Sequence, residues 1–555
     1  MSNPLDSQKF MIRKPLEEKL GEPQQGRMKV GSQIIRHLSK GIYSTPAMAI
    51  KELVSNAFDA DAPEVRIETN PVSGSIIIHD TGIGMDYKDF DENFTYISRS
   101  SKEDKKTTDS GRPLIGKLGI GFIAVSELCD TMIISSAKKK STTKFTAIID
   151  FTKFKDSKNK DVEFSDISEF TLTNYQKENL DESYTHIELL GLTEGFKNKL
   201  RGISAKGIHE KISKNSFNDV VKEIWKTQSH INIAQKYGPY WEFVMHLASI
   251  IPVKYLDDGP IRKIANIDQS IIKPIKNMAG SFNFTVYLDD MELRKPYLFP
   301  TQNKIDNGEF TVLPFNDTFT ASNGKKVSYI GYMYSQDGGI LVDDWRGLII
   351  RIKNTSIGII DHSFLGYPYE GDTLYYKWTF GEIYVMEGLD DAMNVDRATF
   401  KTADPEYYEF AKSVHRKLKK EVFNSVQQRW HKRNKLEKEH LESVKMNWRK
   451  HSLSKTFSKP FDVLVEKRNF EIGPVKLDRK NQRLMINTIN DVLTSFPARE
   501  RTFLQDILVA VTIARERYPT NPIKQENLLY ELLKELGEKY PKTKGRVKSK
   551  TSESN

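Results

Sequence analysis

The stretch that decides the fold is KELVSNAFDADA, residues 51–62. Its spacing is helical, and Glu52, Asn56 and Asp59 fall at positions i, i+4 and i+7, so their side chains project from one face. A carboxamide such as Asn56 can offer a neutral oxygen to Mg²⁺, while a carboxylate such as Glu52 can polarise a water molecule. Taken alone, the pattern also fits an ordinary solvated helix face.

The segment HDTGIGM, residues 79–85, follows this helix. Asp80 ends an apolar strand, and Gly82 and Gly84 permit a close approach of the backbone. A carboxylate at a strand end can accept a hydrogen bond from the exocyclic amine of adenine, with Met85 packed on the ring. Taken singly, this segment is only an acidic turn.

A second glycine-rich segment, GKLGIGF at residues 116–122, follows a polar loop over residues 98–113 and opens a helix. Exposed amides at a helix N-terminus, together with Lys117, can cradle phosphate groups. The chain contains no GxxxxGK[ST] sequence, so any nucleotide is not held by a Walker-type loop.

The order of these three segments closely resembles that of the GHKL ATPases: DNA gyrase B, HtpG-type chaperones, histidine kinases, MutL and MORC proteins. The resemblance covers about residues 30–195. It implies a Bergerat α/β sandwich that binds ATP with Mg²⁺, with Glu52 as the catalytic general base and Asn56 as the magnesium ligand. The nucleotide-binding residues that it implies are Asn56, Asp59, Asp80, Gly82, Gly84, Met85, Asn93, Gly116, Lys117, Leu118, Gly119, Ile120, Gly121, Phe122 and Thr185.

Two of these residues depend on finer features of the family. Asn93 lies where the chaperone branch places an asparagine near the sugar and phosphates. Thr185 resembles a late threonine that supports adenine recognition through the DxGxG aspartate. The family usually has glycine before that threonine, whereas this chain has Tyr184.

A second α/β region is expected between residues 250 and 400, because SFNFTVYLDD (281–290) alternates apolar with smaller or polar residues, as half-buried strands do. The segments VSYIGYMY (327–334), GLIIRIK (347–353) and EIYVMEG (382–388) are likewise predicted to be strands. The segment EIYVMEGLDDAMNVDRATF resembles the end of the second, transducer domain in chaperone and MutL-like members. There a cation reaches back to the terminal phosphate, and the resemblance implies this catalytic role for Arg397. The alternative is an ordinary surface arginine near a strand end.

Two segments concentrate the net charge of +10. Residues 411–451 hold thirteen Lys/Arg and four Asp/Glu, and residues 541–555 hold five and one. Such clusters neutralise nucleic-acid phosphates, so DNA is a candidate partner, and Trp430 and Trp448 can stack on bases. The alternative is a solvated helix laid on its own domain.

The expected fold class is α+β, with a GHKL sandwich, a transducer-like α/β domain and a C-terminal helical region. The expected divisions are an arm (1–30), the ATPase domain (31–195), a helical insert with the transducer-like domain (196–404), a basic helix (405–451), a C-terminal helical domain (452–540) and a disordered basic tail (541–555).

The composition is that of a soluble globular protein, with 38% hydrophobic and 28% charged residues. The chain has neither an apolar run of membrane-spanning length nor the apolar core of a signal peptide, so a cytoplasmic protein without a membrane partner is expected. The single cysteine, Cys129, cannot form an internal disulfide, and its apolar surroundings favour a core residue.

The function expected from these features is that of a Mg²⁺-dependent ATPase that works as a dimeric, ATP-gated clamp. It would act on nucleic acid or on a partner such as an effector protein, in a defence or DNA-maintenance system. One alternative is a nucleotide-gated, chaperone-like binding module with little turnover. A histidine kinase is a weaker alternative, because a phosphoacceptor helical hairpin would normally precede the ATP domain.

Overall fold

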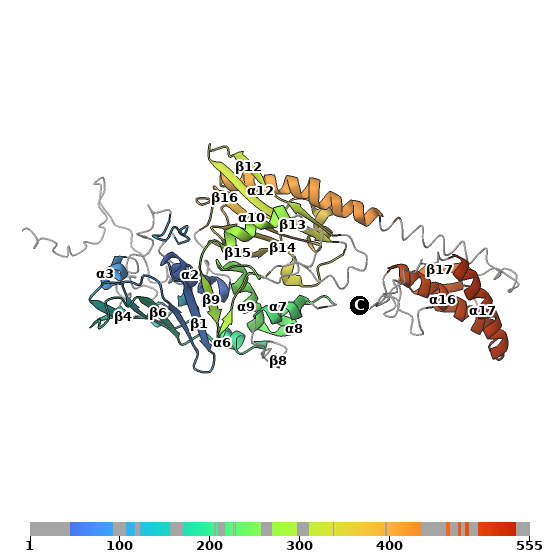
Figure 1. The fold of residues 1–555 in the computed structure, drawn as a ribbon, viewed down its shortest axis with the longest axis horizontal. Helices are drawn as coiled ribbons and strands as arrows, with labels where there is room; N and C mark the ends of the chain where they lie inside the picture. The colour runs from blue at the N-terminus through green and yellow to red at the C-terminus, as the bar shows by residue number, and fades with distance from the viewer. Residues whose placement is uncertain are drawn as a thin grey trace, which may run out of the picture.

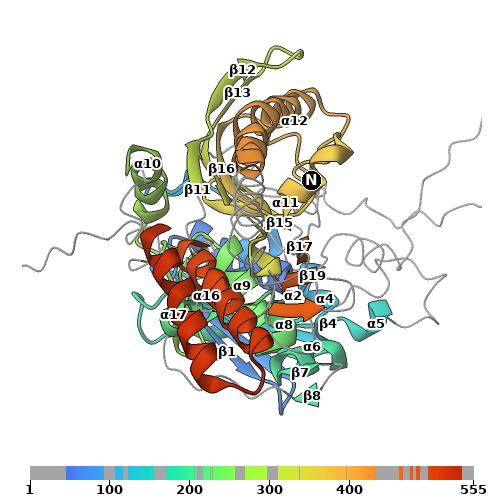
Figure 2. The same ribbon diagram turned by 90° about the vertical axis from the view of Figure 1, so that its right-hand side faces the viewer.

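The computed structural model describes most of the chain between residues 45 and 539, and Figures 1 and 2 show its ribbon. The described residues are 45–92, 107–116, 123–155, 170–204, 207–208, 217–225, 227, 229–256, 269–296, 310–336, 338–394, 397–432, 435, 462–466, 475–478, 483–487 and 498–539. The expected arm (1–30) and tail (541–555) lie outside this set. Within it, no helix has the length and apolar character needed to cross a membrane.

The first sheet has the strand order β10-β9-β1-β2-β6-β3-β4-β5. Its strands are β1 (Glu64–Asn70), β2 (Ser75–Asp80), β3 (Thr131–Ala137), β4 (Thr143–Asp150), β5 (Phe170–Gln176), β6 (Tyr184–Leu190), β9 (Thr285–Leu288) and β10 (Met291–Glu292). All neighbours are antiparallel except β1 and β9, which run parallel. Alternate residues of β2 are buried, as period-two patterning predicts, and Asp80 is in the buried phase.

Helices pack on this sheet. The predicted helix over KELVSNAFDADA is confirmed as α2 (Pro46–Asp59), which starts with a proline at a position where no helical amide is needed. Met48 and Val54 are fully buried, and α2 contacts α4 (Ile123–Ser126) and α9 (Pro239–Ile250). The shorter elements here are α3 (Tyr87–Phe90), α5 (Thr152–Lys155), α6 (Glu194–Leu200), β7 (Ile203–Ser204), β8 (Gly207–Ile208), α7 (Phe217–Trp225) and α8 (Ile233–Tyr237).

The expectation that residues 281–290 join the second α/β region is wrong. Strand β9 pairs with β1 and extends the first sheet. The ring of Phe284 meets the edge of Phe58 at a centroid distance of 5.2 Å, and Asp289 accepts a 2.7 Å hydrogen bond from the Thr69 amide. Period-two alternation identifies a strand but does not say which sheet it joins.

The second sheet has the strand order β11-β13-β16-β14-β15, with β12 also paired to β13. Its strands are β11 (Phe310–Pro314), β12 (Asp317–Thr320), β13 (Lys326–Gln336), β14 (Gly347–Ile352), β15 (Thr355–Asp361) and β16 (Thr379–Glu387). Ile349 of β14 belongs to the core shared with the first sheet, whereas Leu348 and Ile350 belong to a second core. Both faces of this sheet are therefore covered, and every residue of β14 is buried.

Short helices accompany the second sheet: α10 (Gln269–Gly280), α11 (Thr373–Tyr376) and the 3₁₀ turns η6 (Asp343–Trp345) and η7 (Glu370–Asp372). The strands predicted from VSYIGYMY, GLIIRIK and EIYVMEG are confirmed as β13, β14 and β16. Together the two sheets and their helices confirm the predicted α+β class.

The long helix after the second sheet runs beside that sheet in Figure 1. It starts as α12 (Pro405–Lys417), continues through the π-helical turn η8 (Leu418–Phe423) and is α-helical again to residue 432. Its apolar residues recur every four positions, which on a regular α-helix would drift around the axis. The wider π turn offsets that drift. As a result, one face of the helix stays in the second core and buries Phe410, Val414, Leu418, Val422 and Val426.

The C-terminal described segments contain both helices and strands. Two helices, α16 (Ala498–Arg517) and α17 (Pro522–Lys539), pack side by side, as Figures 1 and 2 show. A three-stranded sheet of β17 (Asp462–Glu466), β19 (Arg483–Asn487) and β18 (Val475–Asp478) accompanies them. The sequence predicted the helices but not this sheet.

Candidate functional site

Helix α2 presents Glu52 and Asn56 one turn apart with different exposure. The Glu52 side chain is buried, and its Oε1 atom has no hydrogen-bond partner among the described residues. Asn56 is exposed. A buried carboxylate oxygen without a partner is costly, and this is a common property of groups kept for chemistry.

Asp59, at the end of α2, is already engaged by the backbone of the segment that enters the glycine-rich box. Its two carboxylate oxygens accept hydrogen bonds from the amides of Ile115 and Gly116, each at 2.8 Å. Asp59 therefore fits the role of a residue that positions Gly116 better than the role of a residue that binds the nucleotide itself.

Asp80 lies at the end of β2 with only 6% of its surface exposed. Its Oδ1 accepts a 2.9 Å hydrogen bond from the Gly82 amide. Burial raises the pKa of Asp80 to about 7, although the bond from Gly82 acts in the opposite direction. A hydrogen-bond donor brought to this carboxylate would therefore favour its ionised form.

The turn after β2 needs glycine at both predicted positions. A Cβ on Gly82 would lie 2.7 Å from the carbonyl oxygen of Ala60, at the end of α2. Gly84 has φ +67°, and a Cβ there would lie 1.8 Å from the carbonyl oxygen of Ala137. The turn is thus held closely against α2 on one side and the end of β3 on the other.

Thr185 is brought next to Asp80 by the sheet register. Asp80 on β2 pairs with Thr185 on β6, which pairs in turn with Ser136 on β3. The Ser136 hydroxyl lies 3.3 Å from that of Thr185, donates to the Tyr184 carbonyl at 2.7 Å and accepts from the Met85 amide at 2.9 Å. The side chains of Asp80, Thr185 and Ser136 are all buried, so they form one polar row across three strands.

Sequence reasoning missed Ser136 and Arg112. The buried guanidinium of Arg112 donates to the carbonyls of Phe58 at 3.2 Å, Ala62 at 2.8 Å and Asn283 at 2.7 Å. It thereby gives a further partner to the Phe58 carbonyl in the last turn of α2 and binds the Ala62 carbonyl just after that helix. Arg112 fixes the segment before Gly116 against both α2 and the start of β9.

Contacts also run from the residue beside Glu52 to the second sheet. Lys51 is buried, and its ammonium donates a 2.8 Å hydrogen bond to the Ser356 carbonyl on β15. Two residues further along β15, a Cβ on Gly358 would lie 2.6 Å from the carbonyl oxygen of Ala398. The loop that contains Arg397 therefore lies against the same strand that receives Lys51.

Arg397 itself is buried and has a left-handed backbone, with φ +50°. Its amide donates a 3.0 Å hydrogen bond to the Asn394 carbonyl, inside a tight loop closed by the Met393–Phe400 bridge. The alternative of an ordinary exposed surface arginine does not describe this side chain.

Several predicted residues lie outside the described residues. They are Asn93 and, in the glycine-rich box, Lys117, Leu118, Gly119, Ile120, Gly121 and Phe122. Of the basic segment 411–451, the structure describes residues up to 432 and residue 435. Trp430 is 38% exposed, and Trp448 lies outside the described residues. Cys129 is fully buried, and burial raises the pKa of its thiol to about 12, as befits a core residue.

Comparison with known proteins identifies the class of this domain. Residues 43–185 match the family described as histidine kinase-, DNA gyrase B-, and HSP90-like ATPase. Residues 43–185 are therefore similar to the GHKL ATPases, and this similarity supports ATP binding by the N-terminal domain.

Individual relatives are similar over the same restricted length. The putative type II restriction enzyme HgiDII of Herpetosiphon aurantiacus is 39% identical over 104 residues, which is 19% of this chain and 17% of that protein. The chaperone protein HtpG of Rhodopseudomonas palustris (strain BisA53) is 25% identical over 137 residues, 21% of this chain and 22% of the chaperone. The mitochondrial heat shock protein 75 kDa of Bos taurus is 27% identical over 119 residues, 18% of this chain and 17% of that protein. The chain thus matches about a fifth of the length of these relatives.

Proposed function

We propose that this protein is a Mg²⁺-dependent ATPase in which the nucleotide bound to the GHKL domain controls how that domain engages the second sheet. The observation that carries the proposal is the position of Glu52. One Glu52 oxygen is buried and has no hydrogen-bond partner in the described part of the chain, and the neighbouring Lys51 bridges to Ser356 of the second sheet. A candidate catalytic base and an interdomain contact thus occupy consecutive residues of one helix.

In this proposal the polar row at the end of β2 selects the base. Asp80 accepts a hydrogen bond from the exocyclic amine of adenine, and Thr185 and Ser136 keep this buried edge of the sheet polar. Gly82 and Gly84 let the turn beside Asp80 pack closely on its neighbours, since side chains at these positions would collide with the carbonyls of Ala60 and Ala137.

The residues of α2 suit a magnesium nucleotide. Asn56 offers an exposed amide oxygen, and Glu52 has a carboxylate oxygen that no described residue engages. When bound, Mg²⁺ would neutralise phosphate charge. Glu52 orients and deprotonates the attacking water, and Asp59 holds the segment entering the glycine-rich box through the amides of Ile115 and Gly116.

We extend the proposal to the second sheet and to a second copy of the chain. Arg397 supplies positive charge to the terminal phosphate once the domains close, which couples nucleotide state to shape. Two protomers then form an ATP-gated clamp around a client. The similarity to a putative restriction enzyme favours nucleic acid as the client, with an effector protein as a further candidate partner.

Glu52→Ala tests the catalytic part of the proposal. Turnover should fall by about 10²–10⁴-fold, because a positioned general base contributes that much, while ATP binding stays near the wild-type value. Steady-state phosphate release and calorimetry measure the two quantities. The matched control is Glu68→Ala, an exposed carboxylate on β1. Wild-type turnover in Glu52→Ala would rule out Glu52 as the base.

A further inference from the structure

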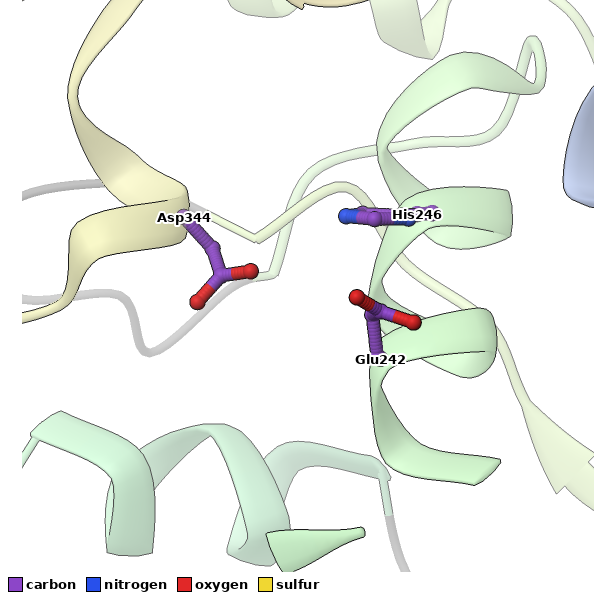
Figure 3. A group of neighbouring side chains, drawn as sticks. All are labelled: Glu242, His246 and Asp344. Atoms are coloured by element: carbon purple, nitrogen blue, oxygen red, sulfur yellow. The ribbon is translucent and has the colours of Figure 1, made fainter. Parts of the chain in front are cut away.

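A group of possible metal ligands lies on α9 and η6, elements that carry none of the residues in the row at the end of β2. Glu242 and His246 are one turn apart on α9, so their side chains leave the same helix face. Asp344, in the turn η6 between β13 and β14, faces them, as Figure 3 shows. Their ligand atoms all lie within 4.8 Å of one another.

We propose that Glu242, His246 and Asp344 form a binding site for a divalent first-row transition-metal ion, with Zn²⁺ as the best fit. The chemistry of the donors supports this choice. An imidazole nitrogen with two carboxylate oxygens suits Zn²⁺, whereas Mg²⁺ and Ca²⁺ prefer ligand sets made only of oxygen. Three protein ligands leave a fourth tetrahedral position for water.

The geometry needs only side-chain adjustment to reach a metal site. In a tetrahedral zinc centre with bonds of about 2.1 Å, neighbouring ligand atoms lie about 3.4 Å apart. The three ligand atoms, which lie within 4.8 Å of one another, must therefore approach by at most about 1.4 Å. Side-chain rotation can supply this movement without a change in the backbone.

Neighbouring groups orient the proposed ligands. Asp344 accepts a 2.8 Å hydrogen bond from the Ile233 backbone amide, and the side-chain Nδ2 of Asn232 lies 3.2 Å from each of its carboxylate oxygens. Lys199 donates to Oε2 of Glu242 at 2.6 Å, which leaves Oε1 for a metal ion. Such outer partners fix ligand direction in metal sites.

The charges at the site also suit a cation. Glu242 and Asp344 bring two carboxylates close to one another, and a cation placed between them would relieve their repulsion.

The proposed ion would tie the two halves of the molecule together. Helix α9 packs against α2, which carries Glu52, while η6 belongs to the connection between two strands of the second sheet. An ion held by both would restrict their relative movement. The proposed ion site shares no residue with the proposed nucleotide site, and its occupation does not depend on ATP turnover.

The test uses the full chain, treated with a chelator, dialysed and kept free of nucleotide. Equilibrium dialysis against Zn²⁺, followed by elemental analysis, should give one saturable ion per chain. Removal of a ligand-orienting partner already costs about 10–100-fold in metal affinity, so His246→Gln, which removes a ligand, should cost about 100-fold or more. Glu242→Gln, which keeps an acceptor for Lys199, should weaken binding similarly. The visible absorption of Co²⁺ bound to the wild type should report a low coordination number and be lost in both variants.

Two controls make the result decisive. His186→Gln removes a partly buried histidine on β6 that contacts Glu188, and it should bind Zn²⁺ like the wild type. Glu52→Ala should also keep the ion. Circular dichroism verifies that each variant is folded. Absence of saturable Zn²⁺ binding, undiminished binding by folded His246→Gln and Glu242→Gln, or loss of the ion in Glu52→Ala would each overturn the proposal.

Discussion

Replacement of Asp80 by asparagine should weaken ATP binding and abolish the preference for ATP over GTP. The Asp80 carboxylate is 6% exposed, so a hydrogen bond from the adenine amine would be made largely out of water. A hydrogen bond to a charged group contributes about 1.5–3 kcal/mol. Loss of that bond therefore corresponds to about a 10- to 150-fold weaker affinity for ATP.

The pH dependence of binding provides a second signature of the same residue. The ionised carboxylate accepts a hydrogen bond from the amine more strongly than the protonated carboxyl does, and the pKa of Asp80 is about 7 in the free protein. Affinity should therefore rise with pH through that value, and the ionised fraction falls about tenfold between pH 8 and pH 6. Asp80→Asn should lack this component, because its amide does not titrate.

Calorimetric titration of the wild type and Asp80→Asn with ATP and GTP, between pH 6 and pH 8, measures both effects. The phosphates of ATP also titrate in this range, but they do so equally for both proteins, so the difference between the two profiles isolates Asp80. Identical pH profiles, or a retained preference for ATP in the variant, would refute the assignment.

Thermal unfolding shows whether the variant is folded and adds a further check. The raised pKa means that the folded state holds the Asp80 proton more tightly than the unfolded chain does. Ionisation of Asp80 therefore costs stability increasingly as pH rises from the unfolded value of 3.8 toward about 7. Asp80→Asn without nucleotide should be more stable than the wild type at pH 8, with a smaller difference at pH 5.

Three further predictions concern other parts of the chain. Asn56→Ala should weaken binding of the magnesium nucleotide in calorimetry, and unchanged affinity would count against a ligand role. Gly84→Ala should lower both thermal stability and ATP affinity. Gly111 also has a positive φ, +84° against +67° for Gly84, but no atom lies within 4 Å of a Cβ placed there, so Gly111→Ala should cost only the backbone strain of about 1–2 kcal/mol. Equal losses in the two variants would show that the close contact at Gly84 is unimportant. Alanine should replace Lys432, Arg433, Lys435 and Lys438 together. If the basic segment binds duplex DNA, the slope of log affinity against log salt concentration should decrease in magnitude by about 0.9 per lost phosphate contact. An unchanged slope would favour a protein client.

The sequence alone predicts the parts of the site that depend on local spacing. Helical periodicity places Glu52 and Asn56 on one face, while their roles in the site come from the resemblance to the GHKL ATPases; the glycines at positions 82 and 84 mark a tight turn after an apolar strand. These features are contained within short segments. The structure places them on α2 and at the end of β2, as expected.

Other parts depend on contacts between distant residues, which local patterns do not specify. Ser136 joins Asp80 only through the register of β2, β6 and β3. The sequence marks Ser136 in only one way: it is a polar residue at a position of its strand that the alternating pattern predicts to be buried. Arg112 and Lys51 are each buried and donate to backbone carbonyls far away in the sequence. The positions of charged residues along the sequence do not identify such partners.

The clearest limit of sequence reasoning is the assignment of strands to sheets. Residues 285–288 have a typical period-two pattern, but only pairing with β1 places them in the first sheet. The apolar stripe between Phe410 and Val426 likewise stays on one face only because of the π turn, which the four-residue spacing alone does not predict. Both features depend on packing partners that lie elsewhere in the chain.

Arg397→Ala tests whether the nucleotide bound to the first domain is coupled to the second sheet. Loss of a preorganised charge donor should lower turnover by about a hundredfold or more, while ATP binding to the open form survives. The control is Lys401→Ala, because Lys401 is exposed and donates to the Asp391 carbonyl at 2.9 Å.

Small-angle scattering with a non-hydrolysable ATP analogue is the most direct measurement. The wild type and Lys401→Ala should change shape when the analogue binds, because the domains close and two protomers associate. Arg397→Ala should bind the analogue and keep the scattering profile of the nucleotide-free protein. An Arg397→Ala protein that closes with the analogue and hydrolyses ATP at the wild-type rate would contradict the account.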